Sequence, residues 1–286
     1  MKETAPAKTC IVIAGPTAVG KTAYAIKLAQ ELQTAIISAD SRQCYIEMNI
    51  GVAKPSAQEL ATVPHFFVNS HHVTTHVSAA DFEKYALEKA ATLFEIHDTI
   101  VMVGGTGLYI KAFTDGLDEL PETDPSIRTS LNQLLEEKGL RALQEMLQEK
   151  DPAYWSQGEI QNPRRIMRAL EVILSTGNSI VTYQRGAPKK RDFDIVKKSI
   201  EMPREQLYER INQRVDKMME EGLLEEVKSL LPYRHLSALQ TVGYQEIFDH
   251  LDGHISLEEA VALIKRNSRH YAKRQITWFK KEGFTP

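Results

Sequence analysis

Cysteine is scarce in this chain of 286 residues: only Cys10 and Cys44 occur, and they form no C-x-x-C pair. The sequence therefore predicts neither a disulfide framework nor a structural zinc site, and it indicates a reduced, cytoplasmic protein. No apolar run approaches the length that spans a bilayer, and the first residues lack the apolar stretch of a secretory signal. We expect neither a membrane segment nor a leader.

An excess of charge of one sign is also missing. The formal net charge is −3 at pH 7, which argues against a generally basic coat for nucleic acid, although an average can hide local patches. No internal repeat or low-complexity segment is evident. With 42% hydrophobic residues, the chain is long enough for one sizeable core and a smaller second unit.

The most informative stretch that is present has the spacing G-x-x-x-x-G-K-T, typical of a phosphate-binding loop. Its residues are Gly15, Pro16, Thr17, Ala18, Val19, Gly20, Lys21 and Thr22. The apolar run 10–14 before it predicts a buried parallel strand, and residues 21–32 predict a helix. Glycines let backbone N–H groups face a polyanion, the helix N-terminus adds partial positive charge, and Lys21 adds an ammonium. Thr22 is placed to hold Mg²⁺.

A second short strand, residues 35–38, leads directly to Asp40. Ligands of open α/β sheets lie beyond the carboxyl ends of the strands, so Asp40 should lie beside the phosphate loop. Three roles are open for this carboxylate: a general base, support of Mg²⁺ through water, or a helix N-cap. Lys54, in the following loop, is either a second phosphate contact or a solvated surface lysine.

The next segments complete the expected sheet. Residues 65–70 predict a third strand, and the nearby His71, His72 and His76 lack metal-ligand spacing, so they favour a partly exposed cluster. Residues 78–94 predict an amphipathic helix with Ser78 as its N-cap and Asp81 closing the capping box.

The strand at 99–103 ends differently from that of an ordinary nucleotide triphosphatase. Such enzymes place an acidic magnesium ligand at this point, whereas this chain continues with the neutral loop Gly104-Gly105-Thr106-Gly107. The loop is either a structural turn or part of the phosphate site, and beside a phosphate loop the second reading is favoured. A phosphate loop used for something other than phosphoryl transfer would account for the missing acid.

The composition then changes from α/β to helical. Apart from residues 179–181, the stretch from Pro125 to about Asp192 shows only helical periodicity, and residues 192–200 predict the last strand. We therefore expect an α/β fold: a parallel sheet core like that of P-loop nucleotide triphosphatases, flanked by helices. This core comprises residues 1–117 and 193–286, with a helical insertion domain at residues 118–192.

Basic residues are concentrated on three predicted helices. A helix opening at Pro163 carries Arg164, Arg165 and Arg168, which suit a phosphodiester or a base edge but equally a solvated face. In a helix at 205–221, Arg210 and Arg214 lie one turn apart and could share an anion, although Arg210 could instead pair with nearby glutamates.

The last helix, which begins at about Ser256, carries the third concentration. Residues 265–281 hold seven Lys or Arg and no acid, interleaved with Tyr271, Trp278 and Phe279. That pattern fits a single-stranded or looped nucleic acid, unless the aromatics face the core.

Six segments together resemble the bacterial tRNA dimethylallyltransferase family. They are Gly15 to Thr22, Asp40 to Tyr45, Gly51 to Pro55, Gly104 to Tyr109, Pro163 to Val172 and Ala272 to Trp278. The resemblance covers almost the whole chain. It implies transfer of a dimethylallyl group from dimethylallyl diphosphate to N6 of the adenosine on the 3′ side of the anticodon, in tRNAs reading codons that begin with U. In this family the phosphate loop binds the diphosphate rather than ATP.

The resemblance also implies roles for individual residues. Catalytic roles fall to Asp40, Thr106 and Arg128, and diphosphate binding falls to Gly15–Thr22 with Arg214. Magnesium is the implied cofactor, on Thr22 and through water on Asp40. Contacts with the tRNA anticodon stem-loop are implied for Asp40, Ser41, Arg42, Gln43, Thr106, Arg128, Arg164, Arg165, Ile166, Met167, Arg168, Lys273 and Arg274. The protein is expected to be a monomer.

Departures from the family pattern are modest. Val19 stands where a serine is usual, which puts only a side-chain contact in doubt, and His65 is followed by Phe66 where a second histidine is common. Two other enzyme classes remain as alternatives: a small-molecule kinase with a phosphate loop, and an adenylate isopentenyltransferase acting on free AMP. A tRNA-binding module without catalysis would leave the phosphate loop and Asp40 unexplained.

Overall fold

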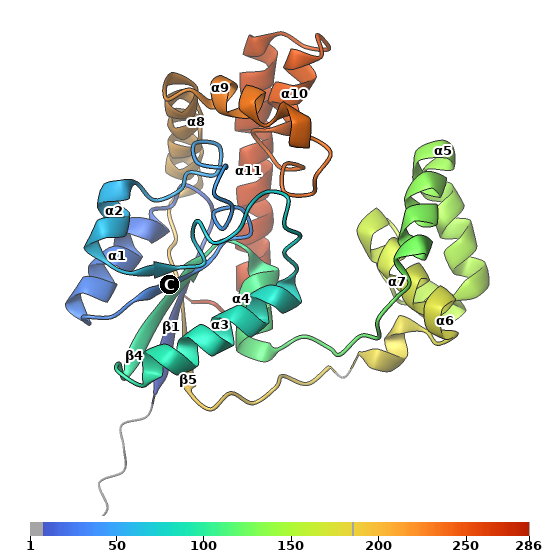
Figure 1. Ribbon diagram of the computed structural model, residues 1–286, viewed down its shortest axis with the longest axis horizontal. Helices are drawn as coiled ribbons and strands as arrows, with labels where there is room; N and C mark the ends of the chain where they lie inside the picture. Colours follow the sequence, from blue (N-terminus) through green and yellow to red (C-terminus); the bar gives the residue numbers. More distant parts are fainter. Residues whose placement is uncertain (1–7, 185, 286) are drawn as a thin grey trace, which may run out of the picture. The chain divides into compact units, whose positions relative to one another are not determined.

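The computed structural model describes residues 8–184 and 186–285. The chain divides into a core unit, residues 1–116 and 189–286, and an insertion unit, residues 117–188 (Figure 1). The sequence placed the return to the core at 193. The chain rejoins it four residues earlier because the N–H of Lys189 donates to Asp115 O at 2.7 Å, and the Arg191 guanidinium donates to Ala112 O and Phe113 O.

The core unit is built on a five-stranded parallel sheet in the order β3-β2-β4-β1-β5. This confirms the expected α/β fold class. The strands are β1 (Thr9–Ala14), β2 (Ile36–Ala39), β3 (His65–Phe66), β4 (Thr99–Gly104) and β5 (Asp194–Ser199). The predicted strand at 65–70 is wrong beyond Phe66, since Phe67 and Asn69 adopt positive φ angles of 63° and 52°, which an extended strand does not allow.

Both faces of the sheet are covered, because alternate strand residues point to opposite sides. On one face, Ile13, Ile36 and Val101 pack against α1 (Lys21–Glu31). On the other, Val12, Ile37 and Met102 belong to the main core, which includes residues of α3 (Ala79–Phe94) and α4 (Gly107–Asp115). The predicted Ser78 N-cap is confirmed: Ser78 and Asp81 form a capping box at the start of α3.

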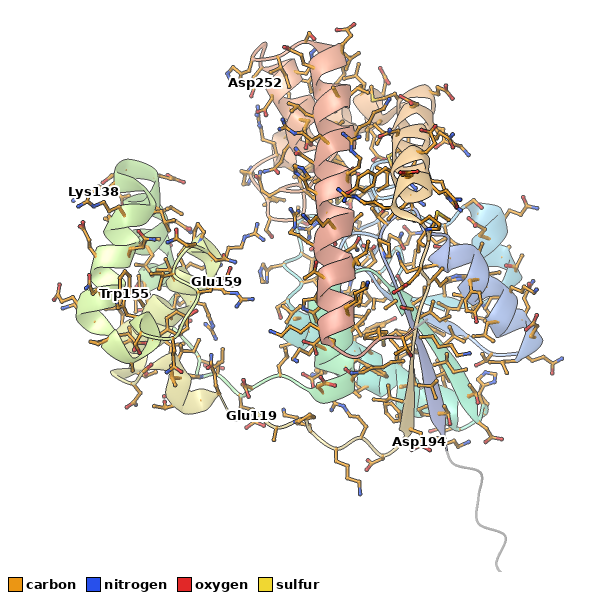
Figure 2. All side chains as sticks on the ribbon, turned by 180° about the vertical axis from the view of Figure 1, so that it is seen from behind. Glu119, Lys138, Trp155, Glu159, Asp194 and Asp252 are labelled. Carbon is orange, nitrogen blue, oxygen red and sulfur yellow. The ribbon has the colours of Figure 1, made fainter. Side chains whose placement is uncertain are left out.

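The remaining helices of the core unit follow β2 or β5. They are α2 (Ala57–Thr62), α8 (Arg204–Glu220), α9 (Leu223–Ser229), η2 (Leu231–Tyr233), α10 (Gln245–Leu251) and α11 (Leu257–Lys281). Ser256 and Glu259 form a capping box at the start of α11, as the predicted beginning near Ser256 implies. The long α11 lies beside α8 and α10, and its buried face includes Ala260, Ile264 and Phe279 (Figures 1 and 2).

The insertion unit is helical and has its own apolar core. It contains α5 (Pro125–Lys150), α6 (Pro152–Trp155), α7 (Pro163–Thr176) and the short η1 (Ile180–Tyr183). Leu143, Leu147, Ile166 and Leu170 are buried together in it. The apolar residues 179–181 that resembled a strand open a 3₁₀ turn capped by the Ser179 hydroxyl. None of the described helices is both long and apolar enough to span a bilayer.

Candidate active site

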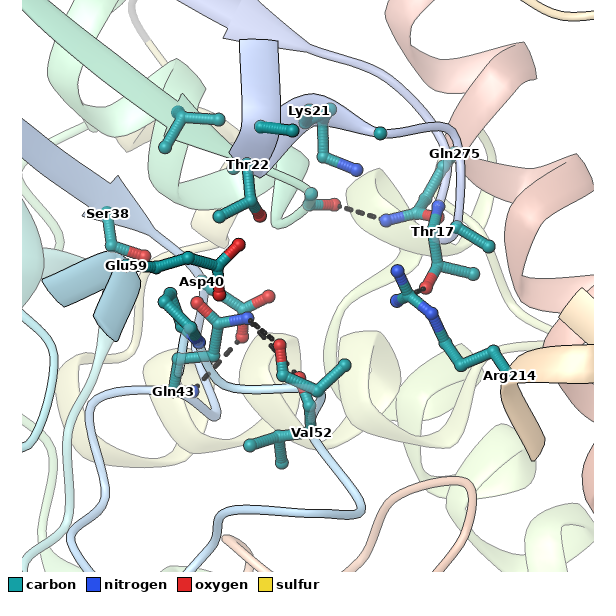
Figure 3. Close-up of a pocket in the computed structure, with 18 of the residues that line it drawn as sticks. Thr17, Lys21, Thr22, Ser38, Asp40, Gln43, Val52, Glu59, Arg214 and Gln275 are labelled. Atoms are coloured by element: carbon teal, nitrogen blue, oxygen red, sulfur yellow. Dashed lines mark hydrogen bonds between the residues drawn. The ribbon is translucent and has the colours of Figure 1, made fainter. Parts of the chain in front are cut away.

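The carboxyl ends of β1, β2 and β4 open onto a cavity of about 260 Å³ (Figure 3). Its walls come from the phosphate loop, the Asp40 turn, residues of the 52–59 segment, the glycine loop at the end of β4, and side chains of α8 and α11. The residues that line it include Thr17, Lys21, Thr22, Asp40, Gln43, Gly104, Gly105, Arg210, Arg214, Tyr271 and Gln275. The structure therefore brings together segments that the sequence separates by more than 200 residues.

The phosphate loop has the backbone conformation of an anion cradle. Gly15, Ala18 and Gly20 have positive φ angles of 148°, 64° and 102°, which turn successive N–H groups toward one side. Gly20 is the N-cap of α1, and no side chain caps this helix. The first N–H groups of α1 therefore remain for a ligand, reinforced by the helix dipole.

The side chains of Ala18 and Val19 do not face a ligand. Both are buried in an apolar cluster with Leu207 and Ile211 of α8. Val19, which stands where a serine is usual in the family, therefore packs in this cluster. Both residues can contribute only their backbone N–H groups to a phosphate.

Lys21 and Arg214 carry positive charge that the protein does not neutralise fully. Burial, helped by the nearby Arg214, lowers the pKa of Lys21 to about 7, and Asp40 only partly opposes this. Burial and the neighbouring Arg210 likewise lower the pKa of Arg214. In this state the Lys21 Nζ donates to Pro16 O at 2.7 Å. A bound polyanion would stabilise the charged form of both side chains.

Arg210 lines the cavity together with Arg214, as their spacing of one helical turn predicts. Two guanidinium groups of α8 therefore line the cavity beside the phosphate loop.

Asp40 caps its own turn with one carboxylate oxygen. Its Oδ1 accepts the N–H groups of Arg42, at 2.9 Å, and Gln43, at 3.3 Å. The helix N-cap role that the sequence left open is therefore not the one observed: Asp40 caps a turn, because residues 41–44 form no helix. Within residues 8–184 and 186–285, Oδ2 accepts no hydrogen bond, and Asp40 lines the cavity. Capping by Oδ1 thus leaves Oδ2 for a ligand.

The glycine loop after β4 explains why no strand-end acid is present. A Cβ atom on Gly104 would collide with the backbone of Ala39 in the neighbouring strand, so no side chain fits there. Thr106 lies beside this point. Its Oγ1 accepts the N–H of Ser41 at 3.0 Å and lies 3.3 Å from the Ser41 hydroxyl. The loop thereby fixes the segment that follows Asp40.

Gln275 is the main site residue to which the sequence assigned no role of its own; it was included only in the segment Ala272 to Trp278. It is buried, its Oε1 accepts the N–H of Thr17 at 2.8 Å, and its Nε2 donates to Gly105 O at 2.8 Å (Figure 3). The available signal was a glutamine that shares the inward face of a basic helix with Ala272 and Phe279. Glu59 and His65 also line the cavity.

Lys54 does not line the 260 Å³ cavity, and it is half-buried rather than a fully solvated surface lysine. Its Nζ donates to Tyr45 O at 2.6 Å, Asn69 Oδ1 at 2.6 Å and Asn49 Oδ1 at 3.0 Å. Burial lowers its pKa to about 8. Lys54 instead cross-links its own loop, beside a neighbouring cavity of about 650 Å³.

Three of the predicted RNA-contacting arginines of the insertion unit, Arg128, Arg165 and Arg168, have acidic partners. Glu171 is buried, and its two oxygens contact Arg128 at 3.0 Å and Arg168 at 3.2 Å. Arg165 pairs with Glu159 at 2.9 Å. In the part of the chain that the structure describes, no carboxylate lies within ion-pair distance of Arg164. Arg128 and Thr106 belong to different units, and their joint role stays a prediction.

Two predicted tRNA contacts in α7 need correction. Ile166 and Met167 are 0% and 5% exposed and pack in the core of the insertion unit. Apolar side chains at these positions close the core beneath the arginines. Their side chains are therefore not available to an RNA.

The aromatic residues of α11 have different surroundings. Phe279 is buried, and Trp278 packs so closely on α4 that a Cβ on Gly107 would lie 2.5 Å from its ring. Tyr271, in contrast, lines the cavity and is 38% exposed. Lys273 and Arg274 are exposed. The helix thus has a core face, a cavity face and a basic outer face.

The oxygen ligands around the cavity fit magnesium. Thr22, Ser38, Asp40 and Glu59 all line it (Figure 3), and hard oxygen donors are those that Mg²⁺ prefers. Among the described residues no cluster of three or more His, Cys, Asp or Glu side chains could enclose a metal. Magnesium commonly binds through one or two protein oxygens plus substrate phosphates, and that mode needs no such cluster.

Fold and site together define a class: α/β proteins whose phosphate loop serves a cavity without a strand-end acid. Residues 43–282 match the family model described as IPP transferase. The chain belongs to the IPP transferase family, as the resemblance in its sequence indicated.

Named relatives agree with this assignment. The tRNA dimethylallyltransferase of Cytophaga hutchinsonii is 46% identical over 276 residues, which cover 96% of this chain and 91% of that protein. The tRNA dimethylallyltransferase 1 of Bacteroides thetaiotaomicron is 45% identical, with 96% and 89% covered.

Two solved structures have the same fold. The full-length tRNA isopentenylpyrophosphate transferase of Bacillus halodurans superposes with a TM-score of 0.69 at 39% identity, covering 96% of this chain and 87% of that one. A eukaryotic dimethylallyltransferase acting on tRNA gives a TM-score of 0.78 at 27% identity, covering 95% and 70%.

Proposed function

We propose that this protein transfers the dimethylallyl group of dimethylallyl diphosphate to N6 of the adenosine on the 3′ side of the anticodon, in tRNAs reading codons that begin with U. The observation that carries the proposal is the cavity that joins the phosphate loop, the buried Lys21 and Arg214, and Asp40. The name of the relatives, tRNA dimethylallyltransferase, supplies the acceptor and the group transferred, and the phosphate loop supports a diphosphate as the donor's leaving group.

The diphosphate side of the cavity suits stabilisation of a leaving group. In the transfer, the bond between the allylic carbon and the diphosphate oxygen breaks, and negative charge collects on the departing diphosphate. The N–H groups at the start of α1, the Lys21 ammonium and the Arg214 guanidinium are preorganised to stabilise that charge. Burial, together with the neighbouring arginine in each case, lowers the pKa of both side chains, so a bound diphosphate would favour their charged forms.

The acceptor side of the cavity suits activation of an amine. The adenine N6 amino group is a weak nucleophile because its lone pair is delocalised into the ring. As the new N–C bond forms, N6 loses a proton, and we assign Asp40 Oδ2 as the acceptor of that proton. A positioned base of this kind typically contributes ~10²–10⁴-fold in rate. We propose that Thr106 and Arg128 hold the substrate nucleotide. The Thr106 hydroxyl also accepts a hydrogen bond from the Ser41 N–H.

Thr22, with Asp40 through water, is proposed to hold Mg²⁺. Bound there, the ion would neutralise part of the diphosphate charge. The remaining residues around the cavity bind and orient the two substrates.

Contacts with tRNA are proposed on two basic surfaces. One comprises Lys273 and Arg274 on the outer face of α11, and the other comprises Arg164, Arg165 and Arg168 on α7 of the insertion unit. Ser41 to Gln43, next to the cavity, would contact the nucleotides beside the target. The adenine must leave its stack to enter the cavity, as base-modifying enzymes generally require. We propose a cytoplasmic monomer.

Incubation with labelled dimethylallyl diphosphate, Mg²⁺ and unmodified tRNA tests the proposal, with AMP and ATP as acceptors in parallel reactions. We expect label in tRNA and none in either nucleotide. Label in AMP would indicate an adenylate isopentenyltransferase. Transfer of the terminal phosphate of ATP to a small acceptor, without prenyl transfer, would indicate a kinase, which the crowded Gly104 position disfavours.

A further inference from the structure

We infer that Gln275 is a specificity-determining residue: it caps the beginning of the phosphate loop and restricts the cavity to ligands with two linked phosphates. The inference rests on the proposed function, in which the ligand of the loop is a diphosphate. It adds a structural reason why a loop with the spacing of a nucleotide triphosphatase would not accept a triphosphate.

The first observation is that both polar atoms of the Gln275 amide are hydrogen-bonded. Its Oε1 accepts the Thr17 N–H and its Nε2 donates to Gly105 O, each at 2.8 Å. The side chain is 6% exposed, so this orientation is fixed by both bonds in a buried setting. One amide therefore connects the phosphate loop with the glycine loop after β4.

The second observation concerns the other polar group of Thr17. Its hydroxyl accepts a hydrogen bond from Arg214 Nη1 at 3.3 Å. The N–H of Thr17 is thus hydrogen-bonded to a side chain of α11, and its hydroxyl is hydrogen-bonded to a side chain of α8. By contrast, the helix end of the loop, at Gly20, has no side-chain cap.

This asymmetry determines how long a phosphate chain the loop can hold. A phosphate at the helix end uses the N–H groups of Gly20, Lys21 and Thr22, and the Lys21 ammonium reaches the next one. A third phosphate that extended toward the beginning of the loop would find the Thr17 N–H already taken by Gln275. It would also meet Gln275 Oε1, an acceptor that repels phosphate oxygens.

A purely structural role for Gln275 makes a different prediction. If the amide only held the loops together, its removal would weaken diphosphate and triphosphate binding by the same factor. If it limits phosphate length, the ratio of the two affinities must change. The ratio is therefore the quantity to measure.

The experiment is calorimetric titration of the full-length protein with inorganic diphosphate and inorganic triphosphate, each with Mg²⁺. We expect the wild type to prefer diphosphate. Gln275→Ala should shift the affinity ratio toward triphosphate by about tenfold, the contribution of one charge-assisted hydrogen bond. Gln275→Met keeps the length of the side chain without its polar atoms. If the alanine variant unfolds, the affinity ratio of the methionine variant should show the same shift.

Gln213→Ala is the matched control, because Gln213 lies on α8 next to Arg214 but bonds only to the exposed Glu209. Its affinity ratio should equal that of the wild type. The inference is overturned if the wild type has no preference, or if neither Gln275 variant changes the ratio. Failure of the proposed function is separate: it would appear as a wild type that does not prenylate tRNA, whatever the ratio.

Discussion

At the scale of single residues, the cavity sets three basic side chains, Lys21, Arg210 and Arg214, against Asp40 and Glu59. Lys21 is the most affected, since burial and Arg214 outweigh the attraction of Asp40 and bring its pKa to about 7. Lys21 is therefore a titratable group whose protonated form a bound polyanion would stabilise.

A pH dependence of diphosphate binding follows. At pH 8 most Lys21 side chains are neutral before binding, and a bound polyanion raises their pKa, so binding should take up a proton. At pH 6 Lys21 is already charged and this uptake should vanish. Affinity should accordingly fall as the pH rises above about 7. Titration calorimetry in buffers with different ionisation enthalpies measures the proton uptake.

Lys21→Arg is the control for this measurement, since a guanidinium stays charged at both pH values. Subtracting its proton count removes the titration of the diphosphate itself. Equal proton uptake by the wild type and this variant at pH 8 would contradict the assignment of the titrating group to Lys21.

Asp40 offers a second test at this scale. Asparagine keeps an Oδ1 acceptor for the N–H groups of Arg42 and Gln43 but cannot take a proton. Asp40→Asn should therefore lower turnover by about 10²-fold or more. Affinity for tRNA should stay within a few-fold of the wild type. Single-turnover rates and filter-binding affinities are the two measurements, and unchanged turnover would remove Asp40 from the mechanism.

At the scale of elements, α9 holds the loop that follows Asp40. Glu226 accepts the N–H groups of Asn49, Ile50 and Gly51 at 2.8–3.0 Å, and the Tyr244 hydroxyl at 2.6 Å. The same loop supplies the Val52 and Ala53 carbonyls that fix the Gln43 amide. One carboxylate of α9 thereby supports a wall of the cavity.

Removal of this carboxylate should destabilise the core unit. Glu226→Ala leaves three backbone N–H groups and a buried hydroxyl without their acceptor, which should cost about 2–4 kcal/mol of unfolding free energy. Urea denaturation measures it. Glu225→Ala, an exposed neighbour 3.9 Å from Lys228, should change stability by less than about 0.5 kcal/mol. Equal effects of the two substitutions would contradict a special role for Glu226.

Sequence reasoning succeeded where the signal is local. The phosphate loop, the capping box at Ser78, the beginning of the last helix near Ser256 and the buried strands are each encoded within about ten consecutive residues. It failed where the position of a side chain depends on a contact with a residue far away in the sequence. The bond from Thr17 to Gln275 spans 258 residues, and the ion pair between Arg128 and Glu171 joins two different helices, α5 and α7. No local pattern contains either contact.

The same limit applies to burial and backbone geometry. The resemblance grouped Ile166 and Met167 with the RNA-contacting arginines, and both are core residues of the insertion unit. The third strand ended early because Phe67 and Asn69 adopt left-handed φ angles, which their residue types do not announce.

At the scale of the whole molecule, two units with separate cores carry separate parts of the proposed function. The core unit holds the cavity, and the insertion unit presents arginines on α7. Since Arg168 shares Glu171 with Arg128 and Arg164 has no acidic partner among the described residues, Arg164 should contribute more to RNA binding.

Arg164→Ala combined with Arg168→Ala should weaken tRNA binding and make it less salt-dependent. The slope of log affinity against log salt should become shallower by about 1–2, because each phosphate contact contributes about 0.7–0.9. Binding measured at several salt concentrations gives the slope. Arg141→Ala, an exposed arginine paired with Glu145, is the control. An unchanged slope in the double variant would show that α7 does not contact RNA.

The central claim is that the phosphate loop holds a departing diphosphate while an adenine amine is alkylated. It is tested most directly by counting both products in one reaction of the wild-type protein with dimethylallyl diphosphate and unmodified tRNA. We expect one diphosphate released for each N6-dimethylallyladenosine, which nuclease mapping should place on the 3′ side of the anticodon. Diphosphate release without the modified nucleoside, or no release at all, would contradict the account.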